Sequence, residues 1–278
     1  MSPADRVCAA VNGAAGKMGR RVVALLAENP RFVLTGAYER DGHPDIGKDS
    51  GVSAGCPKSG VPIKALSPSE RNFQVLIDFS SPEGAELSVQ TAQAVSRPVV
   101  VCTTALTPQQ EKKMAAAAKK IAIVYAPNMS LGMNLLAYLS EQTAKFLGSA
   151  YDMEVVEIHH RLKKDAPSGS AKSLAAALKR GRGGKFTDVH GREGMVGARN
   201  ASELGVHAIR GGDVVGDHTV HFLGAGERLE LVHRASTRDT FAAGAIRAAE
   251  WVLGEPAGLY FARLRAGGRL DSRKFVVR

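Results

Sequence analysis

A glycine-rich turn between an apolar strand and a helix is the feature that most constrains the fold of this chain. Residues 7–11 form an apolar run of strand length, and residues 13–19 read GAAGKMG. Over residues 17–29 apolar side chains recur at helical spacing, and a second apolar run covers residues 32–38. This order predicts a βαβ unit, in which the two strands are parallel and lie in one sheet.

The same alternation continues through the first half of the chain. Strands are expected at 73–79, 99–102 and 121–125, and helices at 82–95 and 108–120, with Ser81 and Thr107 as N-caps. Residues 41–72 are rich in Gly, Pro, Ser and Asp and are expected to be mostly loop. Strands that alternate with helices in this way predict an α/β fold with a Rossmann-like, doubly wound parallel sheet.

After Asn128 the pattern changes. We expect a long helix at 131–147, a strand at 153–160, an Ala-rich helix at 168–179 and a last helix at 241–253. Strands joined by Gly-rich turns dominate between residues 206 and 236. This part therefore predicts a smaller α+β domain with a mixed sheet.

Composition excludes several classes of function. The net charge of +10 is spread along the 278 residues and only 5% of residues are aromatic, so the sequence lacks the basic stripe and stacking platforms of nucleic-acid-binding proteins. No apolar run reaches the roughly 18 residues of a membrane span. Cys8, Cys56 and Cys102 lack CxxC spacing, and no signal-peptide pattern precedes the first strand. We expect a cytoplasmic protein that binds small anions, with no nucleic-acid or membrane partner.

The glycine turn also predicts a binding site. Glycines allow close approach of the backbone, and the first amides of the following helix can bind a pyrophosphate. The spacing GxxGxxG is one residue longer than the usual fingerprint, and by itself such a turn can be only a tight connection. Glu39 ends the second strand about 20 residues beyond the turn, where an acid binds the adenosine ribose, and Arg40 is placed to meet a 2′-phosphate instead. The chain is expected to bind NADH or NADPH, and the sequence does not choose between them.

Two further loops follow predicted parallel strands. They are residues 102–104, Cys-Thr-Thr, and residues 126–129, Ala-Pro-Asn-Met. In an open α/β sheet the ligand crevice lies outside the carboxyl ends of the strands. Both loops are therefore placed to line the nicotinamide side of a bound dinucleotide.

Residues 159–170, which read HHRLKKDAPSGS, are the strongest candidate for chemistry. The two histidines end a strand, Lys163 follows in a loop, and the Pro-Ser-Gly-Ser run opens a helix. A histidine can donate a proton near neutrality, and a lysine can hold a carboxylate or donate a proton. The amides of Gly169 and Ser170 at a helix N-terminus form an anion site. The pattern favours proton-coupled chemistry on a carboxylate, although strand-end histidines and capped helix starts are also common structural features.

The remaining histidines do not predict a metal site. His218 and His221 are three apart in a predicted strand and therefore point to opposite faces of the sheet. The other four have no partner at ligand spacing; they are His43, His190, His207 and His233. No metal is expected.

Taken in order, these residues resemble the 4-hydroxy-tetrahydrodipicolinate reductase (dihydrodipicolinate reductase) family over essentially the whole chain. The matching motifs are residues 13–19, Glu39-Arg40, residues 78–80 and 82–84, Thr103-Thr104, Ala126, Asn128, Ser130, residues 157–160, Lys163, residues 165–169, 210–219 and 226–230. The run from the histidine pair to Ser168-Gly169 is the most specific of them.

The resemblance implies roles for the matching positions. His159 would be the general acid/base and Lys163 a proton donor, and which of the two gives the proton stays open. His160, Gly169 and Ser170 would bind the substrate. The cofactor would be held by Gly13, Ala14, Ala15, Gly16, Lys17, Met18, Glu39, Arg40, Cys102, Thr103, Thr104, Ala126, Pro127, Asn128 and Met129.

The resemblance also implies a reaction and an architecture. The reaction is NAD(P)H-dependent reduction of 4-hydroxy-tetrahydrodipicolinate to tetrahydrodipicolinate with loss of water, in diaminopimelate and lysine biosynthesis. Residues 1–129 and 240–278 would form the dinucleotide-binding domain. Residues 130–239 would form a substrate-binding and oligomerisation domain that builds a homotetramer.

Several positions depart from the family pattern. Cys102 and Ala105 stand where the family usually has glycines, and because only glycine adopts positive φ at low cost, this loop is expected to sit slightly differently. Met129 replaces a frequent Phe, and Ser170 replaces a frequent Thr. These changes bear on cofactor affinity and preference more than on reaction type.

Three alternatives stay open at this point. Another two-domain nicotinamide oxidoreductase, such as an amino-acid dehydrogenase, would share the glycine turn, but Lys163 and Ser168-Gly169 argue against it. A basic nucleic-acid-binding module would need a recognition motif that the sequence lacks. An inactive paralogue would keep the fold and only sense NAD(P)H.

Overall fold

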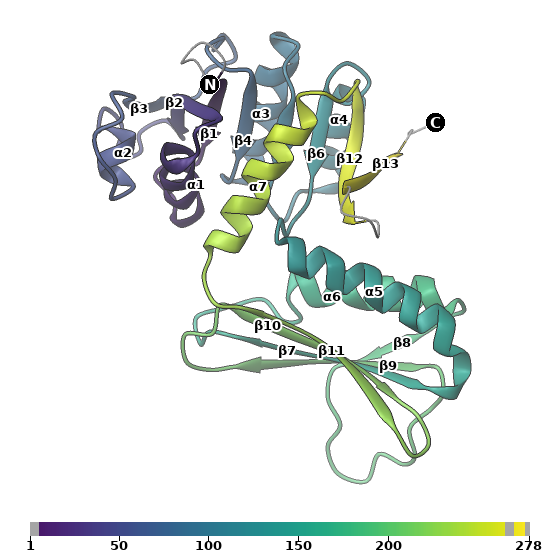
Figure 1. Ribbon diagram of the computed structural model, residues 1–278. Helices are drawn as coiled ribbons and strands as arrows, with labels where there is room; N and C mark the ends of the chain where they lie inside the picture. The colour runs from purple at the N-terminus through teal and green to yellow at the C-terminus, as the bar shows by residue number, and fades with distance from the viewer. Residues whose placement is uncertain (1–5, 265–269, 276–278) are drawn as a thin grey trace. The chain divides into compact units, whose positions relative to one another are not determined.

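The computed structural model describes residues 6–264 and 270–275 (Figure 1). The chain forms two compact units: one is built from the chain up to Ser130 and from Asp239 onward, and the other is Leu131–Arg238. Residues 1–5, 265–269 and 276–278 lie outside the described residues. They belong to the predicted domain of residues 1–129 and 240–278, and the expectation about a signal peptide also concerns residues 1–5.

The first unit is built on a sheet that has eight strands within the described residues, in the order β13-β12-β6-β5-β4-β1-β2-β3. They are β1 (Val7–Asn12), β2 (Phe32–Glu39), β3 (Ile63–Ala65), β4 (Val75–Asp78), β5 (Val99–Val101), β6 (Ala122–Tyr125), β12 (Gly258–Leu264) and β13 (Leu270–Phe275). All neighbours are parallel except β12 and β13. The strand order reverses between β1 and β4, and such a switch point opens a ligand crevice at the carboxyl ends of the strands.

Helices cover both faces of this sheet (Figure 1). They are α1 (Lys17–Glu28), α2 (Ser50–Ser53), α3 (Pro82–Ala94), α4 (Pro108–Ala117) and α7 (Asp239–Val252). The predicted caps of α3 and α4 are confirmed, because the hydroxyls of Ser81 and Thr107 accept first-turn amides at 3.1 and 3.2 Å. Successive side chains of β1 point to opposite faces of the sheet and pack in two separate hydrophobic cores. Ala9 and Val11 pack with α1 and α7, and Ala10 packs with α3 and α4.

The second unit contains a mixed sheet in the order β11-β10-β7-β9-β8. Its elements are α5 (Leu131–Leu147), a 3₁₀ turn (Gly148–Ala150), β7 (Asp152–His159), α6 (Gly169–Arg182), β8 (Thr187–Val189), β9 (Glu203–Arg210), β10 (Gly216–Leu223) and β11 (Arg228–Ala235). β7 and β8 are parallel to β9, whereas β10 is antiparallel to β7 and β11. One sheet face forms the core, where Met153, Val155 and Phe222 pack with Leu174 of α6.

The predicted fold class is confirmed, since a Rossmann-like parallel sheet and a second, mixed sheet are both present. The expectation that residues 41–72 are mostly loop is confirmed, and the short α2 and β3 are the exceptions. The sequence pattern also does not predict β8, and β3 and β8 have only three residues each, too few for alternation to be recognised. Among the described residues, no helix combines the length and apolarity needed to cross a membrane.

Candidate active site

The end of β7 carries a buried acid and a histidine that contact each other. Side chains alternate along this strand, and Glu157 and His159 both take the buried face. The Glu157 carboxylate has 0% exposure and accepts hydrogen bonds from His159 Nδ1 and, at 3.0 Å, from the backbone amide of Ser168. Both terminal nitrogens of Arg210 donate to the same carboxylate at 2.8 Å. One carboxylate therefore joins β7, β9 and the start of α6.

This pairing determines the ionisation of Glu157 and the tautomer of His159. Burial raises the pKa of the Glu157 carboxyl, but the hydrogen bonds that it accepts, first from His159, outweigh burial and lower the pKa to about 2. An ionised carboxylate can only accept hydrogen bonds, so Nδ1 of His159 must carry the proton between them. Nε2 is then the ring nitrogen that is available for proton exchange with a substrate.

His218 lies beside this pair, on β10. The antiparallel register places it opposite Glu157, and its ring meets the His159 ring edge-on with centroids 5.2 Å apart. Nε2 lies 3.3 Å from the Ser168 hydroxyl, and Nδ1 has no hydrogen-bond partner within the described part of the chain. Burial and the neighbouring His159 lower the pKa of His218 to about 4, so His218 is neutral near pH 7.

The sequence pattern indicates no role for His218 or Arg210, and the structure places both in this cluster. The alternation of side chains along the strand correctly predicts that His218 and His221 point to opposite faces of the sheet, and His218 lies on the buried face. The missing part is pairing between strands that are distant in sequence, which brings His218 and Arg210 to Glu157. A local pattern does not contain that information.

The loop between β7 and α6 carries the rest of the predicted catalytic segment. Lys163 Nζ pairs with Asp165 Oδ1 at 2.7 Å, and the backbone carbonyl of Asp165 accepts Arg210 at 2.7 Å. Ser168 is the N-cap of α6, and its hydroxyl accepts a first-turn amide at 3.2 Å. Gly169 is exposed, and a Cβ added there would meet no atom within 4 Å. The N-terminus of α6 is therefore open to a ligand.

The predicted substrate-binding residues lie in this same segment. His160 directly follows β7 and is half-buried, with its amide bonded to the Val214 carbonyl at 2.8 Å. Ser170 is half-buried in the first turn of α6, next to Gly169. Lys163 adds positive charge near His218. The segment thus gathers an imidazole, a cation and the first amides of a helix, which suits an anionic substrate that is protonated during reaction.

The glycine turn between β1 and α1 forms a backbone cradle. The amides of Gly13 and Ala14 donate to the Tyr38 carbonyl at 2.9 Å. Gly13 has a φ of +79°, and a Cβ there would collide with the Phe79 carbonyl. Gly16 is the N-cap of α1, whose first turn has neither a side-chain cap nor an acidic residue. A turn made only of glycines and alanines, placed before an uncapped helix start, fits the pyrophosphate of a dinucleotide.

A cavity of about 510 Å³ opens beside this turn. Glu39 and Arg40, at the end of β2, line it together with glycines of the turn, and Glu39 Oε1 accepts the Ala15 amide at 3.1 Å. Asp41 and His43 also line the cavity, although no sequence motif singles them out. Both lie in the tight turn that follows Arg40, in the segment expected to be mostly loop.

A buried carboxylate, that of Asp78, gathers donors at the carboxyl ends of three neighbouring strands. Asn12 Nδ2 donates at 2.9 Å, and the hydroxyls of Ser80 and Ser88 donate at 2.8 and 2.7 Å. The Thr103 hydroxyl also donates to Asp78, and it accepts the Ser80 amide at 2.9 Å. Because Ser80 lines the cavity, this network fixes part of the cavity wall.

The loop after β5 keeps a conformation that favours glycine. Ala105 has a φ of +62°, in the left-handed region that an alanine adopts at a cost. Cys102 is buried, and burial, together with the nearby Asp78 charge, raises the pKa of its thiol. Thr103 is buried and Thr104 is exposed. Of the two departures from glycine, Ala105 is the one that carries backbone strain.

The predicted loop after β6 lies partly in the core. Ala126 and Met129 are buried among the side chains under α7, and the Met129 carbonyl lies so close to Gly244 that a Cβ on Gly244 would not fit. Pro127 is exposed, and Asn128 is half-buried with its side-chain oxygen accepting a backbone amide at 2.9 Å. Pro127 and Asn128 are therefore the members of this loop that are reachable from solvent.

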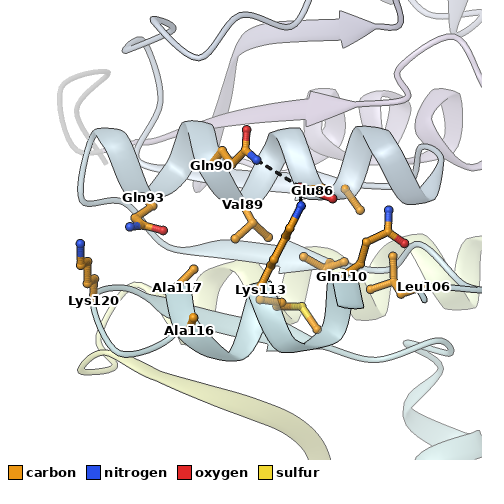
Figure 2. A pocket seen from close by; sticks show the side chains of 13 residues that line it. Glu86, Val89, Gln90, Gln93, Leu106, Gln110, Lys113, Ala116, Ala117 and Lys120 are labelled. Carbon is orange, nitrogen blue, oxygen red and sulfur yellow. Dashed lines mark hydrogen bonds and ion pairs between the residues drawn. The ribbon is translucent and has the colours of Figure 1, made fainter. Parts of the chain in front are cut away.

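A second hollow, of about 310 Å³, lies between α3 and α4 (Figure 2). Val89 and Met114 contribute apolar lining, and Lys113 reaches from α4 to Glu86 on α3 at 2.5 Å. It shares no residue with the 510 Å³ cavity or with the predicted site residues. In the described ranges, no group of three or more His, Cys, Asp or Glu side chains is arranged to hold a metal ion.

Comparison with known proteins identifies close relatives. A family model described as dihydrodipicolinate reductase, N-terminus, matches residues 7–129, and one described as dihydrodipicolinate reductase, C-terminus, matches residues 132–263. A 4-hydroxy-tetrahydrodipicolinate reductase from Anaeromyxobacter sp. (strain Fw109-5) is 47% identical over 90% of this chain and 94% of its own length. The one from Geotalea uraniireducens (strain Rf4) is 42% identical over 90% and 95%.

Solved structures share the fold. A dipicolinate-bound dihydrodipicolinate reductase from Paenisporosarcina sp. TG-14 superposes with a TM-score of 0.72 at 24% identity, covering 92% of this chain and 97% of its own. A DAP dehydrogenase of C. glutamicum in complex with DAP gives a TM-score of 0.53 at 16% identity, covering 92% and 93%. The fold is therefore shared with the DAP dehydrogenase and does not distinguish it from a dihydrodipicolinate reductase, whereas the family models match only the latter.

Proposed function

The chain belongs to the dihydrodipicolinate reductase family, and on this premise we propose how its residues carry out the family's reaction. The reaction is NAD(P)H-dependent reduction of 4-hydroxy-tetrahydrodipicolinate to tetrahydrodipicolinate with loss of water, in diaminopimelate and lysine biosynthesis. The observation that carries the proposal is the pairing of Glu157 with both His159 and the start of α6. It sets a proton donor beside an open helix N-terminus.

The nicotinamide cofactor fits the glycine turn, because Gly13 and Gly16 leave the backbone free of side chains and α1 begins without a cap. When bound, the cofactor supplies the hydride. Glu39 holds the adenosine ribose, and Arg40 meets a 2′-phosphate where one is present. We propose that both NADH and NADPH are used, because the cavity offers an acid for ribose hydroxyls and a cation for phosphate.

The substrate is held in the second unit by its carboxylates. The amides of Gly169 and Ser170 bind one carboxylate, and His160 and Lys163 provide further polar and charged contacts. His159 Nε2 then gives a proton to the ring carbon adjacent to the one that receives the hydride. Lys163 is the second candidate for this proton. The solved relative with bound dipicolinate supports a dicarboxylate ligand, since dipicolinate carries two carboxylates.

We also propose that the enzyme is a cytoplasmic homotetramer that assembles through the second sheet. On the sheet face opposite its helices, Ile158 of β7 lies beside Ile209 of β9, and Val232 lies on β11, beyond Thr219 of β10. Ile209 and Val232 are 49% and 48% exposed, and a partner subunit on this face would cover both. The free cysteines fit a reducing compartment. Light scattering would measure the mass of the assembly, and a monomer would contradict the proposal.

A coupled assay tests the activity. The unstable substrate is made freshly from pyruvate and aspartate semialdehyde by the synthase of the preceding step, and NADH or NADPH oxidation is followed by absorbance. Folded wild-type protein should oxidise at least one cofactor, and oxidation of neither contradicts the proposed function.

Variants of single histidines test the proton donor. His159→Gln should lower kcat roughly 10²–10⁴-fold, the range for a lost general acid, with little change in dipicolinate binding. His190→Gln is the matched control, because His190 lies in the same unit, bonded to the Val206 carbonyl, and should leave kcat unchanged. Undiminished turnover by His159→Gln would leave Lys163 as the donor.

A further inference from the structure

The two oxygens of the Glu157 carboxylate accept hydrogen bonds from different parts of the site. Oε2 accepts His159 Nδ1 and one Arg210 nitrogen, and Oε1 accepts the Ser168 amide and the other Arg210 nitrogen. One oxygen therefore orients the imidazole, and the other fixes the first residue of the α6 cap. Arg210 spans both oxygens as a planar fork, which holds the carboxylate plane in place.

We propose that Glu157 is a positioning residue for the reaction: it fixes the proton-donating His159 and the substrate-binding N-terminus of α6 in one geometry, with Arg210 as its counter-charge. This inference rests on the proposed function, in which His159 gives the proton and α6 binds a substrate carboxylate.

Stability alone does not explain this arrangement. A fully buried ion pair is commonly no more stabilising than apolar residues of the same volume, because both charges lose their hydration. Glu157 is fully buried all the same. What apolar side chains would not provide is an acceptor that assigns the His159 proton to Nδ1 and leaves Nε2 for the substrate.

The network also reaches the second candidate for proton donation. Arg210 donates to the Asp165 carbonyl, and the Asp165 carboxylate pairs with Lys163. Displacement of Glu157 would therefore release Arg210 and, with it, the loop that carries Lys163. The positioning role holds whichever of His159 and Lys163 gives the proton.

Glu154 provides a matched control on the same strand. It points to the opposite sheet face, where its carboxylate accepts Arg192, Arg199 and, at 2.8 Å, His207 Nε2. Glu154→Gln thus removes the same charge from a comparable Arg–His cluster that does not include His159 or α6. Arg210→Lys and Arg199→Lys form a second matched pair, since lysine keeps the charge but loses the fork.

The experiment compares Glu157→Gln with Glu154→Gln in the full-length protein, using the coupled assay over a pH series and calorimetric titration with dipicolinate. We expect Glu157→Gln to lower kcat roughly 10–10³-fold, within the range of a displaced general acid. Dipicolinate binding should weaken several-fold, because the α6 N-terminus shifts. The pH–rate profile should also change, because Glu157 is the carboxylate that contacts the His159 ring. Glu154→Gln should keep wild-type values in all three measurements.

A spectroscopic readout separates the two proposals. The proton shared by His159 Nδ1 and Glu157 should give a downfield NMR resonance that is absent in His159→Gln and Glu157→Gln and present in Glu154→Gln. If wild-type protein shows this resonance but reduces no substrate, the proposed function fails and the pairing stands. If wild-type protein is active and Glu157→Gln matches Glu154→Gln in kcat, pH profile and dipicolinate affinity, the positioning role is wrong. If Glu157→Gln does not fold, Arg210→Lys against Arg199→Lys decides by the same criteria.

Discussion

Asp78→Asn should loosen the wall of the 510 Å³ cavity that we propose for the cofactor, because Asp78 lies behind that wall and bonds Asn12 and Ser80, which line it. The side chain is 0% exposed, and its carboxylate accepts Asn12 Nδ2 and the hydroxyls of Ser80, Ser88 and Thr103. All four of these side chains donate, so Asp78 serves them as an acceptor. An asparagine keeps the shape but replaces one acceptor oxygen with an NH₂ group.

The magnitude follows from which donors can adapt. Oδ2 is the oxygen shared by Asn12, Ser80 and Ser88, so an NH₂ group at that position faces three donors. The two serine hydroxyls can rotate and accept, but the Asn12 NH₂ group cannot. It keeps the Gly84 carbonyl and the Ser88 hydroxyl as acceptors at 3.2 and 2.9 Å. Two NH₂ groups would nevertheless face each other in place of the Asn12 bond to the carboxylate, and such a mispaired buried donor costs about 1–3 kcal/mol. The remaining bonds lose their charge assistance, which adds about 1 kcal/mol. We therefore expect a loss of about 2–4 kcal/mol in the free energy of unfolding.

Calorimetry and cofactor kinetics measure the effect. About 3 kcal/mol corresponds to a Tm lowered by roughly 5–10 °C in a chain of this size. KM for NADH and NADPH should rise together, because Ser80 and Thr103 anchor the cavity wall rather than the 2′-phosphate position. Ser88→Ala is the comparison variant: it removes one donor and leaves the carboxylate with the others, so its loss should stay near 1 kcal/mol. A wild-type Tm and KM in Asp78→Asn would refute the reasoning.

Three further predictions concern charge, strain and acid stability. Arg40→Ala should weaken NADPH relative to NADH by about 1–2 kcal/mol, the value of one charge-assisted contact, and an unchanged ratio of Kd values in fluorescence titrations would remove Arg40 from the phosphate site. Ala105→Gly should raise stability by about 0.5–1 kcal/mol, because glycine adopts the φ of +62° without strain, and a lowered Tm would contradict this account. The pKa of Glu157 is lowered to about 2 in the folded protein, so its ionised form stabilises the fold above the unfolded value of about 4.3. That contribution is lost as the pH falls, and the free energy of unfolding should decline from about pH 5 to pH 2 less steeply in Glu157→Gln than in wild type.

Local patterns predicted the elements that are long or capped. The helix expected at 131–147 is observed as Leu131–Leu147, and the caps at Ser81 and Thr107 are present. These features depend on residues within one or two turns of each other, so a sequence window contains the relevant physics. The short strands β3 and β8 do not fill such a window, and their partners lie on other segments.

The residues of the candidate site also differ in whether a local pattern could predict them. The segment 159–170 was found because its histidines, its lysine and its helix start are neighbours in sequence. Arg210 and His218 lie 53 and 61 positions after Glu157 in the sequence. They reach Glu157 only through strand pairing, so no local pattern indicates a role for them. The fold contributes what the segment lacks: the partner that fixes a tautomer and the cation that balances a buried charge.

The two buried carboxylates, Asp78 and Glu157, are stabilised by chemically different donors. Asp78 collects hydroxyls and an amide, which are neutral, and their role is to hold three strand ends in register around the cofactor cavity. Glu157 collects an arginine and a titratable imidazole, so its charge is coupled to the protonation of His159. A cofactor cradle must keep the same shape through turnover, and neutral donors serve that need because they do not change charge with pH. A proton donor must change charge in every cycle, and a carboxylate backed by a permanent cation lets it do so without leaving a buried charge unpaired.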